Sequence, residues 1–558
     1  MPDNQTNTTT VRNSISRFFK IIRLEKREIS AIYFYAILYG LLQLTLPLGI
    51  QSIVNFVQAN VFSTSLIILI ILVVAGVFLT GLLQVNQMKL NERIQQNLFA
   101  RYTFEFSYRL PKMDLQGLDG YYLPELVNRF FDVVSLQKGV AKILLDIPVA
   151  TIQILFGLIL LSFYNTIFIV FGLVLIIVLI LVLRITSRHG FETSMEESDY
   201  KYKVAAWLQE MARVLKSIKY SKGTTLHMEK SDKYLSGYLK ARTSHFKILL
   251  TQYWALIFFK VIITAAMLIV GGVLLVKNQL NIGQFVAVEI VIISVLASVE
   301  KFIISLDKVY DVLTSVEKLG KVIDKPLEKS GTIRLNTENG LSIKANEVDF
   351  GFSGKRVLNS ISFEIKSGSV VCITGKEGGG KSTLLRLLTG AYSNFSGEIL
   401  LNDVPIRNYS LESLREHTGI VFNQQDIFQG TLWENISMGN CVYSEQQVMN
   451  MAKKIGLDTF IQSLEKGFDT ELDATGRRLS KSVTRKVLFL RALVLKPTLL
   501  LLEDPLEGMD DISRTQVLEI IRQELKQATV IIATNDNQFK QDCDHVFELN
   551  AGNLKVLR

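Results

Sequence analysis

Six long apolar runs stand out in the N-terminal half of the chain, and polar segments separate them. They cover about residues 31–56, 64–85, 144–163, 166–183, 254–276 and 284–304. Each is close to the roughly 20 residues that a helix needs to cross the hydrocarbon layer of a membrane. The pattern therefore predicts six membrane-spanning helices, an even number that puts both chain ends on one side of the membrane.

Two of the connections between these runs, 85–142 and 184–253, are long, polar and still periodic at helical spacing. In the second, the apolar positions include Val204, Leu208, Met211, Leu215 and Ile218. Helices that continue for about 28 residues past the membrane would reach about 40 Å into the cytoplasm. We expect the chain to turn at their tips, near 114–120 and 221–227.

Basic residues predict the orientation of the spans. The two long connections carry 8 and 13 Lys and Arg residues, whereas the remaining connections, 57–63, 164–165 and 277–283, carry only Lys277. Because cytoplasmic loops are enriched in Lys and Arg, we expect both chain ends to lie in the cytoplasm.

The segment before the first run, residues 1–30, has a pattern of its own. Apolar residues fall there at helical spacing with basic residues between them: Ile15, Arg17, Phe18, Phe19, Lys20, Ile22 and Arg23. This pattern predicts an amphipathic elbow helix that lies on the inner leaflet. The run that follows is too long and too far from the start for a cleaved signal peptide, so we interpret it as a retained first span.

Ionisable residues fall in or at the edges of the predicted spans: Asp146, Lys260, Glu289, Glu300 and Lys301. Charged groups are costly in hydrocarbon, so they are expected to face a cavity or one another. Asp146 and Lys301 also suit a position at the interface, whereas Glu289 is a candidate for a translocation path.

Beyond a short polar linker at 324–340, short β-rich runs alternate with helical runs. This change predicts an α/β domain with a mostly parallel sheet at 341–558, after an all-α transmembrane domain at 31–323. The apolar run 370–374 predicts a buried strand, and a glycine-rich segment follows it at once: Gly375, Lys376, Glu377, Gly378, Gly379, Gly380, Lys381 and Ser382.

This segment has the spacing GxxxxGK[ST] between a predicted strand and an apolar helix that begins near Thr383, which is the context that a phosphate-binding loop needs. Glycines let backbone N–H groups converge on phosphates, and the helix N-terminus adds its dipole. Lys381 is expected to reach the β- and γ-phosphates and Ser382 to ligate Mg²⁺. The predicted cofactors are therefore ATP and Mg²⁺. The predicted fold is a multidomain membrane protein with six all-α spans, long cytoplasmic helix extensions and an α/β P-loop nucleotide-binding domain.

Composition and charge agree with a membrane protein. Apolar residues make up 49% of the chain, charged residues 20%, and the mean hydropathy is +0.28. Residues 341–558 hold 25 Lys and Arg against 27 Asp and Glu, a net charge of −2. Subtracting these from the chain totals of 61 and 52 leaves 36 and 25, or +11, for residues 1–340. Because the excess lies in the apolar half, the positive-inside rule explains it, and no nucleic-acid partner is expected.

The three cysteines, Cys372, Cys441 and Cys543, are far apart in the sequence. Their spacing suggests neither a disulfide framework nor a zinc site. We expect reduced and mostly buried thiols.

With these motifs, the chain resembles the ATP-binding cassette (ABC) transporters, in particular exporters in which six spans precede one cassette. The resemblance covers essentially the whole chain. It includes the segment 348–352, whose aromatic residue Phe352 would stack on adenine, and the segment 428–436, which resembles the family's stretch after the Q-loop. It also includes an apolar strand at 498–502 that ends in Glu503 and Asp504, like the Walker B motif.

The chain departs from the family pattern at four places. The Q-loop glutamine position falls on Asn423, with Gln424 one place late. Walker B ends in Glu503 and Asp504, where the family has Asp and then Glu, and the switch histidine position is Asn535. The signature LSGGQ keeps only its first two residues and reads Leu479, Ser480, Lys481, Ser482 and Val483.

The resemblance implies roles for these positions. Ser382, Glu503 and Asn423 would hold Mg²⁺, Ser480 would contact nucleotide, and Asp504 with Asn535 would carry catalysis. A carboxylate that orients and deprotonates water contributes about 10²- to 10⁴-fold in rate, and a misplacement of about 1 Å can cost about 10²-fold. Asn535 can donate a hydrogen bond but cannot accept a proton at neutral pH. We therefore expect ATP binding to survive better than turnover, with the alternative that Asp504 and Asn535 are tolerated in an ordinary ATPase.

Two functions fit these features. The first is ATP-driven export of an unknown substrate by a half-transporter with weak or partner-dependent hydrolysis. Its partners would be a second half-transporter, preferably an identical chain and otherwise a similar one, and the lipids of a bacterial inner membrane. The second is a membrane module that binds ATP without turning it over and gates or scaffolds a secretion complex. Phosphate release discriminates between them.

Overall fold

The computed structural model describes residues 11–59, 64–118, 120–337, 340–352, 354–423, 425–439, 443–494, 496–523 and 525–558. The chain forms two compact units. The first consists of Met1–Pro111 and Tyr121–Lys325, and the second of Lys112–Gly120 and Pro326–Arg558. By its contacts, the tip of the first long connection therefore belongs to the second unit.

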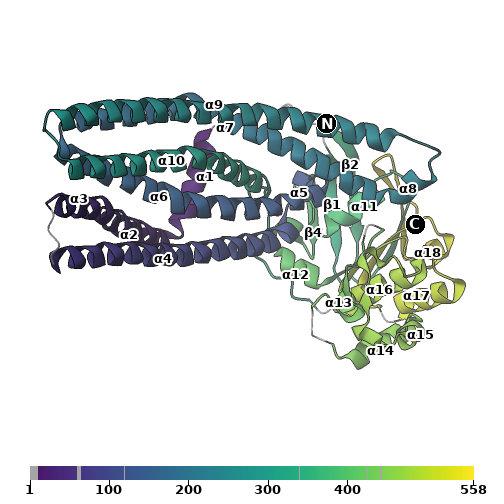
Figure 1. The fold of residues 1–558 in the computed structure, drawn as a ribbon. Helices are drawn as coiled ribbons and strands as arrows, with labels where there is room; N and C mark the ends of the chain where they lie inside the picture. Colours follow the sequence, from purple (N-terminus) through teal and green to yellow (C-terminus); the bar gives the residue numbers. More distant parts are fainter. Residues whose placement is uncertain are drawn as a thin grey trace. The chain divides into compact units, whose positions relative to one another are not determined.

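The first unit is all helical, and its long helices run alongside one another (Figure 1). Its helices are α1 (Val11–Arg23), α2 (Lys26–Gln43), α3 (Thr45–Gln58), α4 (Thr64–Arg109), α5 (Leu123–Asn128), α6 (Asp132–Tyr164), α7 (Ile167–Arg213), α8 (Leu215–Tyr220), α9 (Leu226–Val276) and α10 (Ile282–Ile323). The predicted long connections are confirmed as continuations of α4, α6, α7 and α9. The second tip, between α8 and α9, lies where the sequence predicts a turn.

Five stretches of described helix are long and apolar enough to cross a membrane: Lys26–Gln58, Thr64–Lys112, Leu123–Tyr164, Leu226–Val276 and Ile282–Ile323. The predicted span at 166–183 falls on the start of α7. The apolar stretch described there is the shorter Ile167–Val178.

The predicted first span is two helices, α2 and α3, rather than one. The break comes at Leu44, three residues before Pro47. Proline has no backbone N–H, so it removes one helical hydrogen bond. The Thr45 hydroxyl also donates to the carbonyl oxygen of Leu42 at 2.6 Å, a local bond that competes with regular helix geometry.

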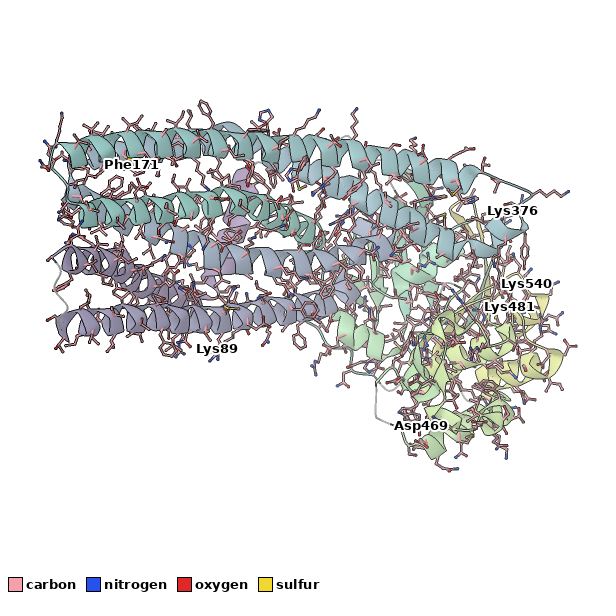
Figure 2. All side chains as sticks on the ribbon, viewed as in Figure 1. Lys89, Phe171, Lys376, Asp469, Lys481 and Lys540 are labelled. Carbon is pink, nitrogen blue, oxygen red and sulfur yellow. The ribbon has the colours of Figure 1, made fainter. Side chains whose placement is uncertain are left out.

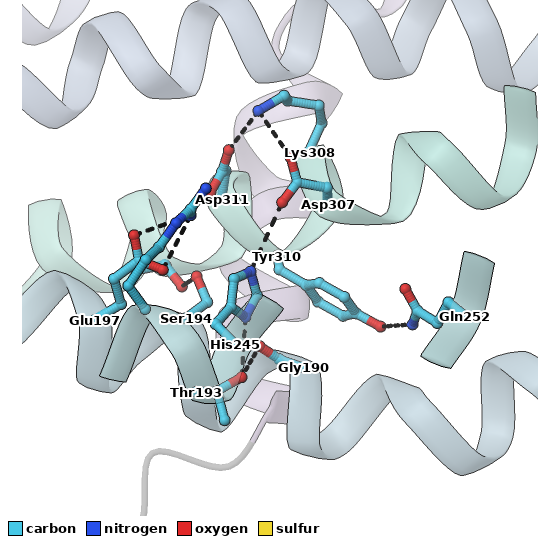
Figure 3. A network of polar contacts seen from close by, with 12 residues as sticks. Gly190, Thr193, Ser194, Glu197, His245, Gln252, Asp307, Lys308, Tyr310 and Asp311 are labelled. Carbon is cyan, nitrogen blue, oxygen red and sulfur yellow. Dashed lines mark hydrogen bonds and ion pairs between the residues drawn. The ribbon is translucent and has the colours of Figure 1, made fainter. Parts of the chain in front are cut away.

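Polar contacts join the long helices of the first unit. Lys260 of α9 and Glu300 of α10 form an ion pair at 3.1 Å, as expected for charges that face each other in an apolar setting. Figure 3 shows a second network around the buried His245 of α9, whose Nδ1 lies 2.9 Å from the Thr193 hydroxyl of α7. Its Nε2 lies 3.7 Å from the carboxylate of Asp307 on α10. The network therefore connects α7, α9 and α10.

The segment predicted to form the elbow helix is helical, as α1, and part of its surface packs on α10. Ser14 is fully buried and donates to Glu317 at 3.1 Å, and Phe18 packs against a buried cluster of the same unit. Phe19, in contrast, is 61% exposed. That this helix lies on the inner leaflet stays a prediction.

The second unit contains a six-stranded sheet in the order β12-β11-β3-β10-β9-β6 and a four-stranded antiparallel sheet in the order β2-β1-β4-β5. The strands of the larger sheet are β3 (Val370–Thr374), β6 (Thr418–Val421), β9 (Leu499–Glu503), β10 (Thr529–Ala533), β11 (His545–Asn550) and β12 (Asn553–Val556). Those of the smaller sheet are β1 (Ile343–Phe352), β2 (Lys355–Ile365), β4 (Ser396–Leu401) and β5 (Val404–Pro405), and β7 (Gly430–Thr431) pairs with β8 (Glu471–Leu472). Neighbouring strands of the larger sheet are parallel except β12, which confirms the mostly parallel sheet.

The second unit also contains helices (Figure 1). They are α11 (Lys381–Leu388), α12 (Leu411–Glu416), α13 (Leu432–Ser437), α14 (Glu445–Lys454), α15 (Asp458–Ser463), α16 (Lys481–Val494), α17 (Asp511–Gln523) and α18 (Asn537–Asp542). Strands β3, β9 and β10 are continuous apolar runs because helices bury them, as is usual for parallel sheets.

Two cysteines that are far apart in the sequence meet in this core. Cys372 of β3 and Cys543 are buried free thiols, and they interact with each other. The contact with Cys372, together with burial, raises the pKa of the Cys543 thiol, which keeps it protonated. Cys441 lies outside the described residues.

Candidate nucleotide site

The candidate site lies at one edge of the larger sheet. The neighbouring parallel strands β3, β10, β9 and β6 all end there, and each is followed by residues singled out in the sequence: 375–382, Asn535, Asp504 and Asn423. Ligands of open α/β sheets bind outside the carboxyl ends of the strands. The topology therefore brings together four segments that are separated by up to 160 positions in the chain.

The phosphate loop requires glycine at positions that the motif marks. Gly375 has φ +141°, and a Cβ added there would lie 2.1 Å from the carbonyl oxygen of Leu549. Gly380 has φ +104° and directly precedes α11. Both positions therefore exclude side chains, and the loop leads straight into a helix N-terminus, which favours phosphate.

The other loop residues are distributed as a phosphate site needs. Lys376 and Glu377 are exposed, and Figure 2 labels Lys376. Lys381 folds over the loop, and its Nζ donates to the carbonyl oxygens of Gly375 at 2.6 Å and Lys376 at 3.0 Å. Thr383 is buried in the first turn of α11. The ammonium group is thus held beside the backbone that would surround the phosphates.

Glu503 contacts both of the other residues of the predicted metal site, Ser382 and Asn423. Its side chain is buried and accepts hydrogen bonds from the Ser382 hydroxyl and, at 3.1 Å, from the backbone N–H of Asn423. A hydroxyl and a carboxylate side by side are the oxygen ligands that Mg²⁺ prefers. Ser382 and Glu503 therefore fit Mg²⁺.

The Asn423 side chain has a different partner. Its Oδ1 accepts from Nη2 of Arg485 at 2.5 Å. Arg485 is buried in α16, and the same Nη2 lies 3.4 Å from the carboxylate of Glu507. In this arrangement the Asn423 carbonyl is directed to Arg485 rather than to the Ser382–Glu503 pair. Gln424, the other Q-loop candidate, lies outside the described residues.

Asp504 has an unusual backbone conformation. Its φ is +40°, and its N–H donates to the carbonyl oxygen of Ala533 at 2.9 Å. Non-glycine residues adopt this left-handed region rarely and at a cost, and such residues gather at functional sites. The chain therefore turns sharply at the end of β9, and the side chain of Asp504 is half-buried.

Asn535 is tied to the start of the phosphate loop. Its Oδ1 accepts from the backbone N–H of Gly375 at 3.0 Å and from the Thr374 hydroxyl at 3.2 Å. A backbone N–H only donates, so this contact fixes which atom of the amide is the oxygen. The Nδ2 group of Asn535 therefore remains a hydrogen-bond donor.

The signature residues form the N-terminus of α16. Ser480 directly precedes the helix, and its hydroxyl accepts from the backbone N–H of Val483 at 3.2 Å. Lys481, labelled in Figure 2, is exposed, and its Cβ lies close to Gly508 of the segment after Asp504. In that segment, the hydrogen bond from the backbone N–H of Ser513 lowers the pKa of the Asp510 carboxyl.

Phe352 lies on the smaller sheet at the end of β1. Its ring makes edge contacts with Phe350 and Tyr392, at centroid distances of 5.0 and 5.5 Å. Phe352 is half-buried. This aromatic cluster fixes the orientation of its ring.

Sequence reasoning missed three residues of this site. Arg485 donates to Asn423 and pairs with Glu507, and the side chain of Asn550 accepts from the backbone N–H of Lys376 at 3.0 Å. For Arg485 a signal was present in the sequence: it lies at helical spacing, i+3 and i+4, from the apolar residues Leu488 and Phe489. Asn550 carries no comparable signal, because only the pairing of β11 with β3 brings it to the loop.

Two family models match the chain. Residues 358–507 match the model described as ABC transporter, and residues 29–298 match the model described as ABC transporter transmembrane region. The chain therefore belongs to the ABC transporters, as an integral membrane protein with an N-terminal transmembrane region fused to a C-terminal ATPase domain.

Several named proteins are similar to parts of the chain. An uncharacterised ABC transporter ATP-binding protein of Bacillus subtilis, YknV, is 30% identical over 52% of this chain and 48% of its own length. The microcin-J25 export ATP-binding/permease protein McjD of Escherichia coli is 28% identical over 50% of this chain and 48% of its own. The chain thus spans about half the length of these relatives.

Longer matches also exist. A putative export ATP-binding/permease protein of Rickettsia bellii is 24% identical over 88% of this chain and 84% of its own. The structure of a bacterial Atm1-family ABC exporter with ATP bound superposes with a TM-score of 0.87 at 20% identity, and covers 95% of this chain and 94% of that one. The two proteins share the same fold.

Proposed function

We propose that the chain is an ATP-driven exporter of the half-transporter type, with its nucleotide-binding domain in the cytoplasm and its spans in a bacterial inner membrane. The observation that carries the proposal is the convergence of the phosphate loop with Glu503, Asp504 and Asn535 at one sheet edge. A nucleotide site on a chain with long apolar helices supports coupling of ATP to movement across the membrane. The relative named as a microcin-J25 export protein supports export as the direction of transport.

Slow hydrolysis is part of the proposal. Asp504 is one carbon shorter than the glutamate of the family pattern, and a water-activating carboxylate must lie within hydrogen-bond reach of its water. Asn535 offers an amide donor but no group that takes up a proton. ATP binding is expected to be ordinary and turnover weak, or dependent on a second chain.

The alternative is a non-hydrolysing module that gates or scaffolds a secretion complex. The hydrogen bond between Arg485 and Asn423 favours it. Because Asn423 is bonded to Arg485, a side chain proposed for the metal site is engaged elsewhere. Export requires repeated turnover, whereas gating requires only ATP binding. Phosphate release by the purified chain therefore separates the two functions.

The ATP site itself is tested by Lys381→Ala. We expect this variant to bind a labelled ATP analogue about 10- to 100-fold more weakly, because it lacks the charge-assisted hydrogen bonds to the β- and γ-phosphates. Equilibrium binding to the purified chain measures the effect. Lys366→Ala is the matched control, since Lys366 is exposed at the end of β2. Equal affinity of Lys381→Ala and the parent would show that the loop is not the ATP site.

A further inference from the structure

A cavity lies in the first unit. It has a volume of about 1120 Å³ and is lined by residues of α4 and α6. Four of the lining residues are basic: Lys89, Arg93, Lys138 and Lys142. On each helix the two basic residues are four positions apart, so each pair lies on one helix face. We call this cavity the basic groove.

The four cations of the basic groove are exposed, and none of them forms an ion pair with a described carboxylate. The two acidic residues of the groove have other partners. Glu92 accepts hydrogen bonds from Gln95 and Gln96 of its own helix, and Asp146 accepts one from Ser305. The groove thus has a net charge of +2, and its cations remain available to an anion.

The basic groove lies where the predicted spans meet the cytoplasm. Lys89 follows the predicted span 64–85 by four residues, and Lys142 precedes the span 144–163 by two. At 1.5 Å per residue these distances are about 6 and 3 Å, which is the depth of the lipid headgroups. Arg93 and Lys138 lie about one turn farther toward the cytoplasm. In Figure 2 the side chain of Lys89 extends outward from α4.

The membrane end of the groove is apolar. Val85 and Met88 line it and are 47% and 61% exposed, and Phe78 and Leu82 continue the exposed apolar surface along α4. The basic groove therefore combines cations at headgroup depth with an apolar track that leads toward the hydrocarbon. A ligand with an anionic head and an apolar tail matches both parts.

We propose that the basic groove is a binding site for an anionic phospholipid of the inner leaflet. The phosphate lies among Lys89, Arg93, Lys138 and Lys142, and an acyl chain lies along the exposed apolar surface of α4. Basic pockets between helices on the cytoplasmic side are typical sites for anionic headgroups. The negative charge of a bound lipid offsets part of the net +2 charge of the groove, and its headgroup bridges α4 and α6.

The test is a lipid titration of the delipidated full chain in mild detergent, followed by native mass spectrometry. The probes are phosphatidylglycerol and phosphatidylcholine with identical acyl chains. We expect the parent to prefer phosphatidylglycerol. Because each cation near the surface strengthens binding about fivefold, Lys89→Gln/Arg93→Gln should bind phosphatidylglycerol about 25-fold more weakly and phosphatidylcholine unchanged. Lys138→Gln/Lys142→Gln should have the same effect from the other helix.

Two controls keep the test specific. Lys216→Gln/Lys219→Gln removes two exposed charges from α8 and should leave the preference intact. Lys89→Arg/Arg93→Lys keeps the charge and should retain the lipid. The proposal is overturned if the glutamine variants bind phosphatidylglycerol like the parent, or if inorganic phosphate displaces the lipid at equal concentration. It is also overturned if dimers exclude the lipid while monomers bind it, because a second copy then covers the groove.

Discussion

At the scale of single residues, Glu503 and Arg485 organise the nucleotide site. Glu503 connects the phosphate loop to the Q-loop through the Ser382 hydroxyl and the Asn423 backbone. Arg485 connects the Asn423 side chain to Glu507. A change at either residue therefore alters segments that are far apart in the sequence.

Arg485→Met is expected to destabilise the nucleotide-binding unit. It removes the hydrogen bonds that the buried, charged Arg485 donates to Asn423 and Phe422, a loss of about 1–3 kcal/mol. For a unit of this size that lowers Tm by about 2–12 °C, measurable by thermal unfolding in detergent. The control is Arg478→Met, whose side chain is 88% exposed and whose ion pair with Asp473 contributes little. Equal Tm values for the two variants would argue against a buried role for Arg485.

At the level of single residues, the sequence predicts local motifs well and long-range side-chain contacts poorly. The phosphate loop was predictable because local geometry dictates its glycines and their spacing. The bond of Asn423 to Arg485 was not predictable, because it joins residues 62 positions apart and depends on how α16 packs against β6. The same holds for Asn550 and Lys376, which are 174 positions apart.

At the scale of elements, helix α1 is anchored to α10 by a buried carboxylate. Glu317 is 2% exposed and accepts from Ser14 at 3.1 Å and from Arg17 at 3.3 Å. Arg17 also reaches Asp324 at 2.7 Å, but Asp324 is largely exposed. The buried contact is therefore expected to dominate the docking of α1.

Glu317→Ala should loosen α1 on α10. Hydrogen bonds to a charged group contribute about 1.5–3 kcal/mol, so exchange protection of the α1 amides should fall at least about tenfold. Hydrogen exchange read by mass spectrometry on peptides from α1 measures it. Asp324→Ala, which removes only the exposed partner of Arg17, should change the protection much less. If both variants exchange alike, the buried contact does not hold the helix.

The hydrophobic pattern predicted which helices and strands exist, but it did not predict where each one ends. The long periodic connections and the strand at 370–374 are as predicted, because apolar periodicity reports burial directly. The break between α2 and α3 was missed, because an apolar run of span length hides a local change of backbone bonding at Pro47. The local sequence pattern also could not predict that Lys112–Gly120 belongs to the second unit, because that assignment depends on contacts between distant segments.

At the scale of the whole molecule, the proposed transporter is a dimer of identical chains in which each nucleotide lies between one phosphate loop and the other chain's signature. Mixing tests this directly. Lys381→Ala and Ser480→Arg should each inactivate homodimers, but in a mixed dimer one site contains neither change. Random mixing makes half of the dimers mixed, each with one of two sites intact, so about a quarter of parental ATP turnover should return. No recovery on mixing would contradict shared sites.

We propose that the chain binds ATP normally and turns it over slowly because of Asp504 and Asn535. The most direct measurement is phosphate release by the purified chain in nanodiscs, for the parent, Asp504→Glu, Asn535→His and the double variant. We expect slow phosphate release by the parent and a gain in the double variant that exceeds the product of the single gains, because groups of one catalytic unit do not act independently. A parent rate of about 1 to 10 per second that Asp504→Glu leaves unchanged would contradict it.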